Sequence, residues 1–382
     1  MRIVHVALRY PPATGGVETY VQNIVERTRN IDEERDVRVL TTKMRTHGPV
    51  SYLEPDDLLD DPPYVQRLFV RQTPVISYPR LQTLQYYIGH HKPDIIEAYS
   101  FWYHAADGAA RYARKKQIPF IFHPMYYENK VRQKMLWRLY AATTGRRTFA
   151  AADVVVVISP FERQLIEKAG FPVKRFELVP PGLDLNKYKD IRTDPFAKRG
   201  IQGEVLLSVG RLSESKGFTD VLEVLPDLIK DTPTLQYVIA GEDFGYGESL
   251  KLQAKHLGIQ DHVHVLGKLS DEELIGVYQH CKVFVHPSHY EAFGIVLTEA
   301  SACRKPIVAR NSSAIPYAAP HNISSLLFNT KDELRESLIA LLKDTELQNK
   351  LGGDGYVYVC KYFDQDVQIK KLVGLYKELG SK

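Results

Sequence analysis

Short apolar runs alternate along the chain with longer stretches in which apolar positions recur at helical spacing. In the first half the runs lie at 1–8, 37–41, 66–70, 93–98, 118–123 and 152–158. In the second half they lie at 204–209, 235–240, 263–270 and 283–285. Runs that are apolar at every position are typical of parallel strands covered on both faces. The pattern therefore predicts an α/β protein whose ligands bind beyond the carboxyl ends of its strands.

The stretches between these runs predict helices, most clearly at 17–29, where apolar residues recur three and four positions apart. Further helices are predicted at 81–88, 331–342 and 346–351, with an amphipathic helix at 362–379. Residues 46–66 are rich in proline and acids and predict a long surface loop.

The strand pattern is interrupted once, in the middle of the chain. Residues 173–184 predict a strand followed by a Pro-Gly break, and the next apolar run begins only after Gln202. A chain of 382 residues is long enough for two domains that each bury a core. We therefore expect one domain at 1–190 and a second at 200–360.

The stretch from Glu291 to Ala300 carries the clearest candidate chemistry. It follows a strand and a Pro-containing loop, and it continues as a helix. Gly294 lets the backbone approach a ligand, while the Ile295 and Val296 amides fall at the helix N-terminus, which suits a phosphate. Glu299 lies eight residues after Glu291, about two helical turns deeper along the axis. Taken singly, either glutamate has a plain alternative, as an acid favoured by the helix dipole or as a solvated surface residue.

A second candidate is the glycine-bounded loop 210–217, which follows the predicted strand 204–209. Arg211 and Lys216 stand five residues apart on it. Two cations at a strand's carboxyl end suit a leaving diphosphate, on which negative charge builds as a bond to it breaks. Arginine can fork onto phosphate while lysine acts as a point charge. The alternative is a solvated loop.

Both stretches resemble the signatures of family 4 retaining nucleotide-sugar glycosyltransferases, which have the GT-B fold. The string E-A-F-G-I-V-L-T-E-A matches the family's E-x7-E signature, and G-R-L-S-E-S-K-G matches its G-R-L-x-x-x-K-G loop. The loop Gly15-Gly16-Val17-Glu18 is similar to the family's G-G-x-E/P. The resemblance implies two Rossmann-like domains that face each other across a cleft. It also implies that 1–190 binds the acceptor, that 200–360 binds the donor, and that the last helix, about 362–382, packs back on the first domain.

The resemblance implies roles for individual residues. Arg211 and Lys216 would stabilise the diphosphate, Glu291 would position the sugar hydroxyls, and His123 would lie beside the sugar ring. The remaining candidates would bind the donor: Gly15, Gly16, Lys268, Phe293, Gly294, Ile295, Val296 and Glu299. His104 is a further candidate for acceptor contact. For His123 the alternative is a strand-end histidine bonded to backbone, and for the glycine pair it is a tight turn.

The chain departs from the family pattern after the second glutamate. Ser313-Ala314 replaces a Gly-Gly pair, and the family's acidic position falls near Tyr317. That loop normally helps to close over the donor. A sugar-nucleotide binding protein without transferase activity therefore remains as a second prediction.

Positive charge is concentrated in the first half, although the net charge is only +4. Between Arg111 and Arg147 ten residues are basic and one is acidic. Within 130–147 basic and aromatic residues interleave, which suits an interfacial helix on an anionic membrane and a lipid-linked or phosphorylated acceptor. The alternative is a helix with a core stripe and a solvated basic face. A nucleic-acid partner is not expected, because no recognised binding module accompanies the cluster.

Other classes of protein are disfavoured. There is no G-x-G-x-x-G dinucleotide fingerprint, and the three cysteines form no C-x-x-C pair. No D-x-D pair follows a strand and no Cys/His cluster is present, so we expect no metal and no cofactor beyond the sugar-nucleotide substrate. The N-terminus resembles a strand more than a signal peptide, and no apolar run reaches a membrane-spanning length, which predicts a cytoplasmic protein.

Overall fold

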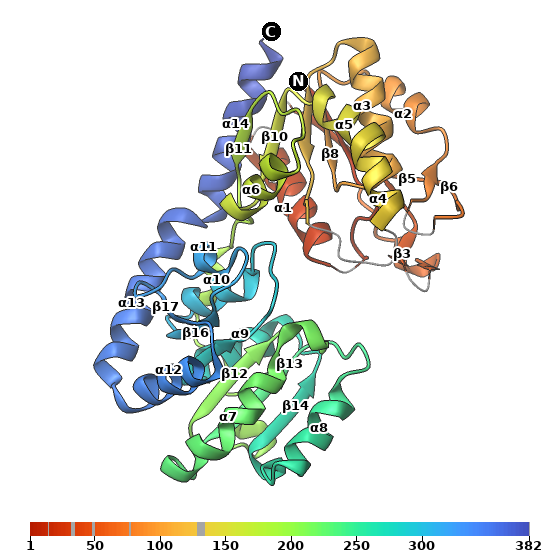
Figure 1. The fold of residues 1–382 in the computed structure, drawn as a ribbon. Helices are drawn as coiled ribbons and strands as arrows, with labels where there is room; N and C mark the ends of the chain where they lie inside the picture. The colour runs from red at the N-terminus through yellow and green to blue at the C-terminus, as the bar shows by residue number, and fades with distance from the viewer. Residues whose placement is uncertain (14, 32–34, 48–49, 76–77, 128–133, 382) are drawn as a thin grey trace. The chain divides into compact units, whose positions relative to one another are not determined.

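The computed structural model describes residues 1–382 apart from 14, 32–34, 48–49, 76–77, 128–133 and 382 (Figure 1). The chain forms two compact units, which are coloured from red to blue along the sequence in the figure. The first comprises Met1–Gly182 with Asp366–Lys382, and the second comprises Leu183–Gln365.

The first unit is built on a seven-stranded sheet in the order β11-β10-β9-β8-β1-β2-β5, in which neighbouring strands are parallel. Its strands are β1 (Arg2–Val6), β2 (Asp36–Thr42), β5 (Val65–Leu68), β8 (Ile95–Tyr99), β9 (Phe120–His123), β10 (Val154–Val157) and β11 (Phe176–Leu178). Two small antiparallel pairs accompany it, β3 (Met44–His47) with β4 (Val50–Tyr52) and β6 (Val70–Arg71) with β7 (Arg80–Leu81). The four valines of β10 are all buried, as expected for a parallel sheet covered on both faces.

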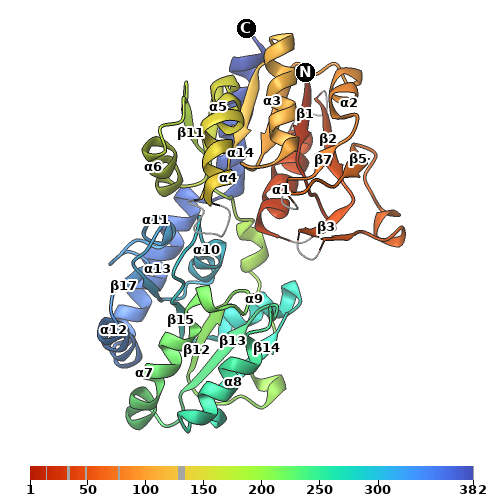
Figure 2. The same cartoon turned by 45° about the vertical axis from the view of Figure 1, so that its right-hand side comes forward.

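Helices cover this sheet, and α3 and α5 lie side by side in both views (Figure 2). They are α1 (Gly16–Ile31), α2 (Leu84–His90), α3 (His104–Lys116), α4 (Lys134–Tyr140), α5 (Arg146–Ala151), α6 (Pro160–Lys168) and α14 (Gln365–Gly380), and a π-helical turn, η2 (Ala141–Gly145), joins α4 to α5. The C-terminal helix α14 belongs to this unit from Asp366 onward. Its Tyr376 hydroxyl donates to Glu97 Oε2 at 2.5 Å, and its Glu378 pairs with Arg175 at 2.8 Å.

The second unit has a six-stranded parallel sheet in the order β14-β13-β12-β15-β16-β17. Its strands are β12 (Val205–Val209), β13 (Gln236–Ala240), β14 (Val263–Gly267), β15 (Val283–His286), β16 (Ile307–Arg310) and β17 (Ser325–Phe328). Its helices are α7 (Phe218–Asp231), α8 (Gly247–His256), α9 (Asp271–His280), α10 (Ile295–Ala302), α11 (Ile315–Ala318), α12 (Lys331–Lys343) and α13 (Thr345–Tyr362). Each unit buries its own apolar core.

Three expectations about local structure were wrong in detail. The predicted loop 46–66 contains β4 and a 3₁₀ turn, Asp56–Leu58. The helix predicted at 81–88 begins only at Leu84, because Thr83 has a positive φ of 58°. The helix predicted to stop at 351 runs on to Tyr362. Gly352 lies inside this helix, where it permits close packing, because a Cβ there would lie 2.2 Å from the Arg304 carbonyl oxygen.

Candidate active site

Lys216 and Glu291 meet in the second unit, with Lys216 Nζ 2.5 Å from Glu291 Oε1. Lys216 ends a 3₁₀ turn after β12, and Glu291 lies in the loop after β15. Because β12 and β15 are neighbouring parallel strands, their carboxyl ends bring the two loops together. Gly217 allows this approach, since it has a φ of +67° and a Cβ there would lie 2.3 Å from the Pro287 carbonyl oxygen.

His286, the last residue of β15, is the second partner of this carboxylate. Its Nε2 lies 3.0 Å from Glu291 Oε1, and its side chain is buried. Burial alone would raise the pKa of Glu291, but the hydrogen bond from His286 and the charge of Lys216 lower it to about 2. Glu291 is therefore ionised near neutral pH, although its side chain is only 14% exposed.

The loop that departs from the family pattern closes on the same glutamate. Ser313 Oγ accepts a hydrogen bond from the Glu291 N–H at 2.8 Å, and the Ala314 N–H donates to the Glu291 carbonyl at 3.2 Å. Ser313 has a φ of 48°, a conformation that favours glycine. The serine thus keeps a glycine-like backbone and adds a hydroxyl that fixes the loop of Glu291.

Gly294 precedes α10 with a φ of 93°, and its lack of a side chain leaves the helix without a side-chain cap. Within the described chain, neither the Ile295 nor the Val296 N–H has a hydrogen-bond acceptor. These donors and the helix dipole point the same way, which is the arrangement that binds a phosphate.

Glu299 lies farther along α10, where two tyrosine hydroxyls donate to it. Tyr278 from α9 donates to Oε2 at 2.9 Å, and Tyr188 donates to Oε1 at 3.3 Å. Burial raises the pKa of the Glu299 carboxyl, and the two hydroxyls oppose this effect. Because a carboxylate offers about four lone-pair positions, Glu299 retains capacity to accept further hydroxyl protons.

The other predicted donor residues are placed less directly. Phe293 is buried and packs edge-on against Phe363 and Tyr317, so its side chain anchors the loop. Lys268 is exposed just beyond β14, and two strands separate β14 from β15, a lateral distance of about 14 Å. Arg211 is exposed, and its guanidinium carbon lies 5.5 Å from the centre of the Phe244 ring. The structure records no contact between Arg211 and Glu291 among the residues it describes.

In the first unit, the predicted glycine pair lies where β1 leads into α1. Gly16 is the first residue of α1, and Glu18 in its first turn is buried and pairs with Arg9 at 2.7 Å. A Cβ on Gly15 would lie 2.2 Å from Glu18 Oε2, so a glycine makes room for this ion pair.

His123, at the end of β9, is completely buried. Its Nε2 lies against Glu97 Oε1, and its Nδ1 lies 3.3 Å from the Tyr20 hydroxyl. Burial alone would raise the pKa of Glu97, but His123 and His5 lower it to about 2. The partners of the ring are therefore side chains of the first unit's interior, not the backbone groups considered above as the alternative.

Two site residues were missed at the sequence level. His286 is the final residue of an apolar strand and precedes Glu291 by five positions, so its place at a carboxyl end was a usable signal. The contact of Ser313 with Glu291 had no local signal, because the two residues are 22 positions apart.

Comparison with known proteins identifies the family. Residues 14–187 match the family model described as Glycosyltransferase Family 4, and residues 192–357 match the model for Glycosyl transferases group 1. The chain belongs to the family 4 glycosyltransferases. Relatives of this family 4 chain include a D-inositol 3-phosphate glycosyltransferase of Corynebacterium jeikeium, 32% identical over 60% of the chain and 58% of the relative. A GDP-mannose-dependent phosphatidylinositol monomannoside mannosyltransferase of Mycobacterium tuberculosis is 28% identical over 61% of the chain and 63% of the relative.

These matches span about three fifths of the length of the curated relatives. Among solved structures, Anabaena HepE in complex with UDP is similar with a TM-score of 0.80 at 18% identity, covering 99% of this family 4 chain and 100% of that one. Sucrose-phosphate synthase from Thermosynechococcus elongatus has a TM-score of 0.78 at 19% identity, covering 100% and 99%. The likeness confirms the predicted GT-B fold.

Proposed function

We propose that the protein transfers a hexose from a nucleotide-diphosphate sugar to a hydroxyl acceptor, with retention of anomeric configuration and without a metal ion. The observation that carries the proposal is the contact of Lys216 with Glu291, close to the start of a helix whose first two amides have no acceptor among the described residues. A cation, free N–H donors and an ionised carboxylate then converge where a sugar diphosphate must be held at both of its ends.

In this proposal the diphosphate lies on the Ile295 and Val296 amides and is neutralised by Lys216 and Arg211. Negative charge grows on its leaving oxygen as the glycosidic bond breaks, and fixed donors stabilise that charge more in the transition state than in the ground state. Arg211 stands exposed on the loop that carries Lys216, and an exposed guanidinium is free to turn toward a bound phosphate.

Glu291 and Glu299 would then hold the two ends of the donor. Glu291 is ionised and accepts hydrogen bonds from sugar hydroxyls, while Glu299 accepts them from the ribose. The departing phosphate oxygen would take the proton of the acceptor hydroxyl on the face where the new bond forms, which gives retention. Gly15, Gly16 and His123 belong to the first unit, which in this proposal binds the acceptor. Because His123 is buried against Glu97, we propose that it positions the strand end.

The acceptor class is suggested by the relatives, which are named for inositol 3-phosphate and for a phosphatidylinositol mannoside. We propose a phosphorylated or lipid-linked hydroxyl acceptor, with peripheral contact at an anionic membrane.

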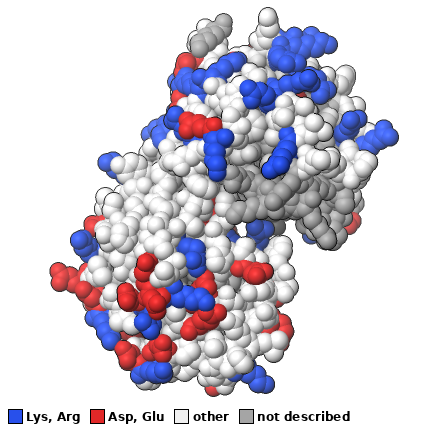
Figure 3. All heavy atoms as spheres, in the orientation of Figure 1, with Lys and Arg blue, Asp and Glu red and all other residues white. Residues whose placement is uncertain are grey.

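Lys and Arg side chains are prominent on the visible face of the first unit (Figure 3). On α4, Met135, Leu136 and Leu139 are exposed, while Trp137 turns into the core. Residues 130–133 of the predicted interfacial segment lie outside the described residues. No helix among those described is long and apolar enough to cross a bilayer.

The alternative is sugar-nucleotide binding without transfer. The sequence of the altered loop favours it, but the backbone of the loop does not, because Ser313 keeps the conformation of a glycine. Two measurements separate the alternatives. The melting temperature should rise with one of UDP-, GDP- or ADP-sugars, since a ligand of the folded state stabilises it. Transfer from that donor, followed by NMR of the product's anomeric configuration with and without EDTA, then tests catalysis, retention and metal independence. Binding without any transfer to sugar phosphates or phosphoinositides would favour the alternative.

A further inference from the structure

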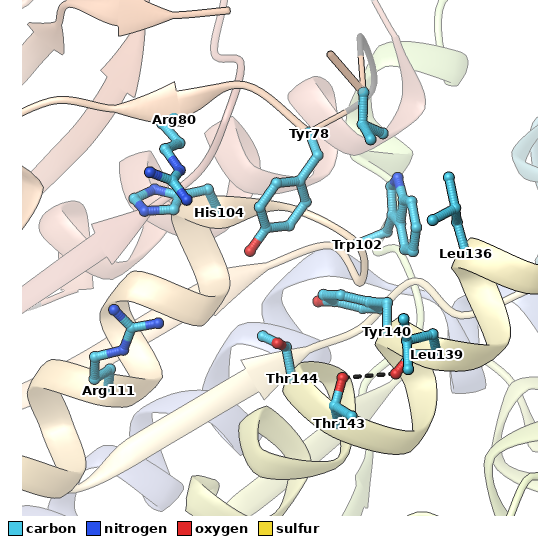
Figure 4. Close-up of a pocket in the computed structure, with 11 residues that line it drawn as sticks. Tyr78, Arg80, Trp102, His104, Arg111, Leu136, Leu139, Tyr140, Thr143 and Thr144 are labelled. Carbon is cyan, nitrogen blue, oxygen red and sulfur yellow. Dashed lines mark hydrogen bonds between the residues drawn. The ribbon is translucent and has the colours of Figure 1, made fainter. Parts of the chain in front are cut away.

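A cavity of about 480 Å³ lies within the first unit, apart from every residue assigned above to the donor (Figure 4). Its walls come from α3, from the segment leading into β7, and from α4 with the π-helical turn η2. It has a cationic end, formed by Arg80, His104 and Arg111, and an apolar end, formed by Trp102, Leu136 and Leu139. In Figure 4 Arg80 lies against His104, and Arg111 stands on the same side of the cavity.

A buried carboxylate holds two of the aromatic residues that line the cavity. Asp107, one turn into α3, accepts hydrogen bonds from the Tyr78 hydroxyl at 2.6 Å and from the Tyr140 hydroxyl at 2.9 Å. The Thr148 hydroxyl donates to the same carboxylate at 2.5 Å. Asp107 thus holds the rings of Tyr78 and Tyr140, which line the cavity, and its oxygens accept hydrogen bonds from these hydroxyls.

At the other end of the cavity, the carboxylate nearest to the cations along α3 is that of Asp107, whose pKa is raised by burial and lowered by the charge of Arg111. Arg80 and Arg111 are exposed, and neither forms an ion pair with any residue the structure describes. His104 Nδ1 accepts a hydrogen bond from the Leu81 N–H at 3.3 Å, which leaves the ring proton on Nε2 as a donor. Burial lowers the pKa of His104, and the charges of Arg80 and Arg111 lower it further. Two guanidinium forks and one N–H therefore offer donors for a multivalent oxyanion.

The apolar end leads to the surface of α4. Leu136 is 44% exposed and Leu139 is 61% exposed, and both also line the cavity. Trp102 packs against Trp137 with ring centres 5.0 Å apart, which gives this end a rigid aromatic wall. A ligand that fills the whole cavity must therefore combine an anionic group with an apolar portion.

We propose that this cavity binds a phosphate group that carries an apolar chain, such as a phospholipid headgroup with the start of its acyl chains. The phosphate lies between Arg80, Arg111 and His104, and the chain leaves along Leu136 and Leu139. None of the residues named above for the donor lines this cavity, and it needs no donor to be filled.

Tryptophan fluorescence of the full chain gives a direct test. The chain has two tryptophans, of which Trp102 lines the cavity and Trp137 packs on it. Titration with short-chain phosphatidate, below its micelle concentration, should change the emission saturably. Inorganic phosphate and short-chain phosphatidylcholine are the comparison ligands. We expect phosphatidate to bind at least tenfold more tightly than either.

Matched variants distinguish binding in this cavity from a general electrostatic attraction of phosphatidate to the basic surface. The double variant Arg80→Ala/Arg111→Ala should weaken phosphatidate binding at least tenfold. The double variant Lys115→Ala/Lys116→Ala removes the same charge from two exposed positions, both on α3 itself, and should bind as the wild type does. Unchanged melting temperatures confirm that both variants fold. Equal losses in the two variants, equal affinity for inorganic phosphate, or saturable binding unaffected by Arg80→Ala/Arg111→Ala would each overturn the proposal.

Discussion

The Ser313 hydroxyl accepts a hydrogen bond from the backbone N–H of Glu291 at 2.8 Å. Ser313 stands where the family pattern has glycine, and it keeps the positive φ, 48°, that glycine would adopt readily. The departure from the family pattern therefore preserves the loop's backbone and adds a bond to the site's central glutamate.

This relationship predicts different effects for two small replacements of Ser313. Ser313→Gly loses the hydrogen bond, worth about 0.5–1.5 kcal/mol, but relieves the strain of a left-handed residue, roughly 1–2 kcal/mol. Ser313→Ala loses the bond and keeps the strain. We expect urea unfolding to show Ser313→Gly within about 1 kcal/mol of the wild type, and Ser313→Ala to be the less stable of the two. The reverse order would mean that the hydroxyl does not support the loop.

The contact of Lys216 with Glu291 predicts a large catalytic effect. Lys216→Ala and Glu291→Gln should each lower kcat about 10²–10³-fold, because each removes a charged group from the transition state's surroundings. Lys255→Ala, an exposed lysine on α8, is the matched control and should keep wild-type rates. Transfer rates at saturating donor provide the measurement, and near-normal rates in both site variants would refute the assignment.

Arg211 should affect donor binding without affecting stability. Its side chain is exposed and its recorded contact is the ring of Phe244, so Arg211→Ala should leave the melting temperature of the free protein unchanged. If the guanidinium binds the diphosphate, the variant should lose about tenfold or more in donor affinity, since hydrogen bonds to charged groups are worth about 1.5–3 kcal/mol. Arg211→Lys should recover only part of it, because lysine lacks the fork. Calorimetry with the preferred sugar nucleotide tests this.

The ionised Glu291 predicts a loss of stability in acid. Its pKa is about 2 in the folded protein, below the ordinary value of 4.5, because of His286 and Lys216. A depressed carboxyl pKa stabilises the fold above pH 4.5, and this contribution disappears as the pH falls toward 2. It amounts to roughly 3 kcal/mol at most. The difference in unfolding free energy between wild type and Glu291→Gln should therefore shrink between pH 5 and pH 3. A difference that stays constant would contradict the proposed charge state.

The burial of His123 predicts a structural effect. His123→Ala would leave the buried Glu97 carboxylate without one of its principal partners, and a buried charged acceptor left without its partner costs roughly 3 kcal/mol. We expect a matching fall in the free energy of unfolding. Tyr20→Phe removes only the hydroxyl on the other side of the ring and should cost much less. A His123→Ala variant of normal stability and no turnover would instead point to direct contact with substrate.

The sequence by itself determined the fold class and predicted which segments would form the site. Unbroken apolar runs such as 154–158 can only be buried between covering helices, and the glycine-bounded Lys216 loop and the Glu291 stretch carry their chemistry within short segments. Such local signals survive without tertiary information.

Only the tertiary structure decided which of these residues contact one another. Neighbouring strands bring Lys216 to Glu291, and the loop after β16 brings Ser313 to the same residue. How far a side chain is buried depends on the packing of its whole unit, in which His123 is buried and Arg211 is exposed. The cavity between Arg80, Arg111 and Leu136 likewise needs three separate segments packed together, and no local pattern specifies that packing.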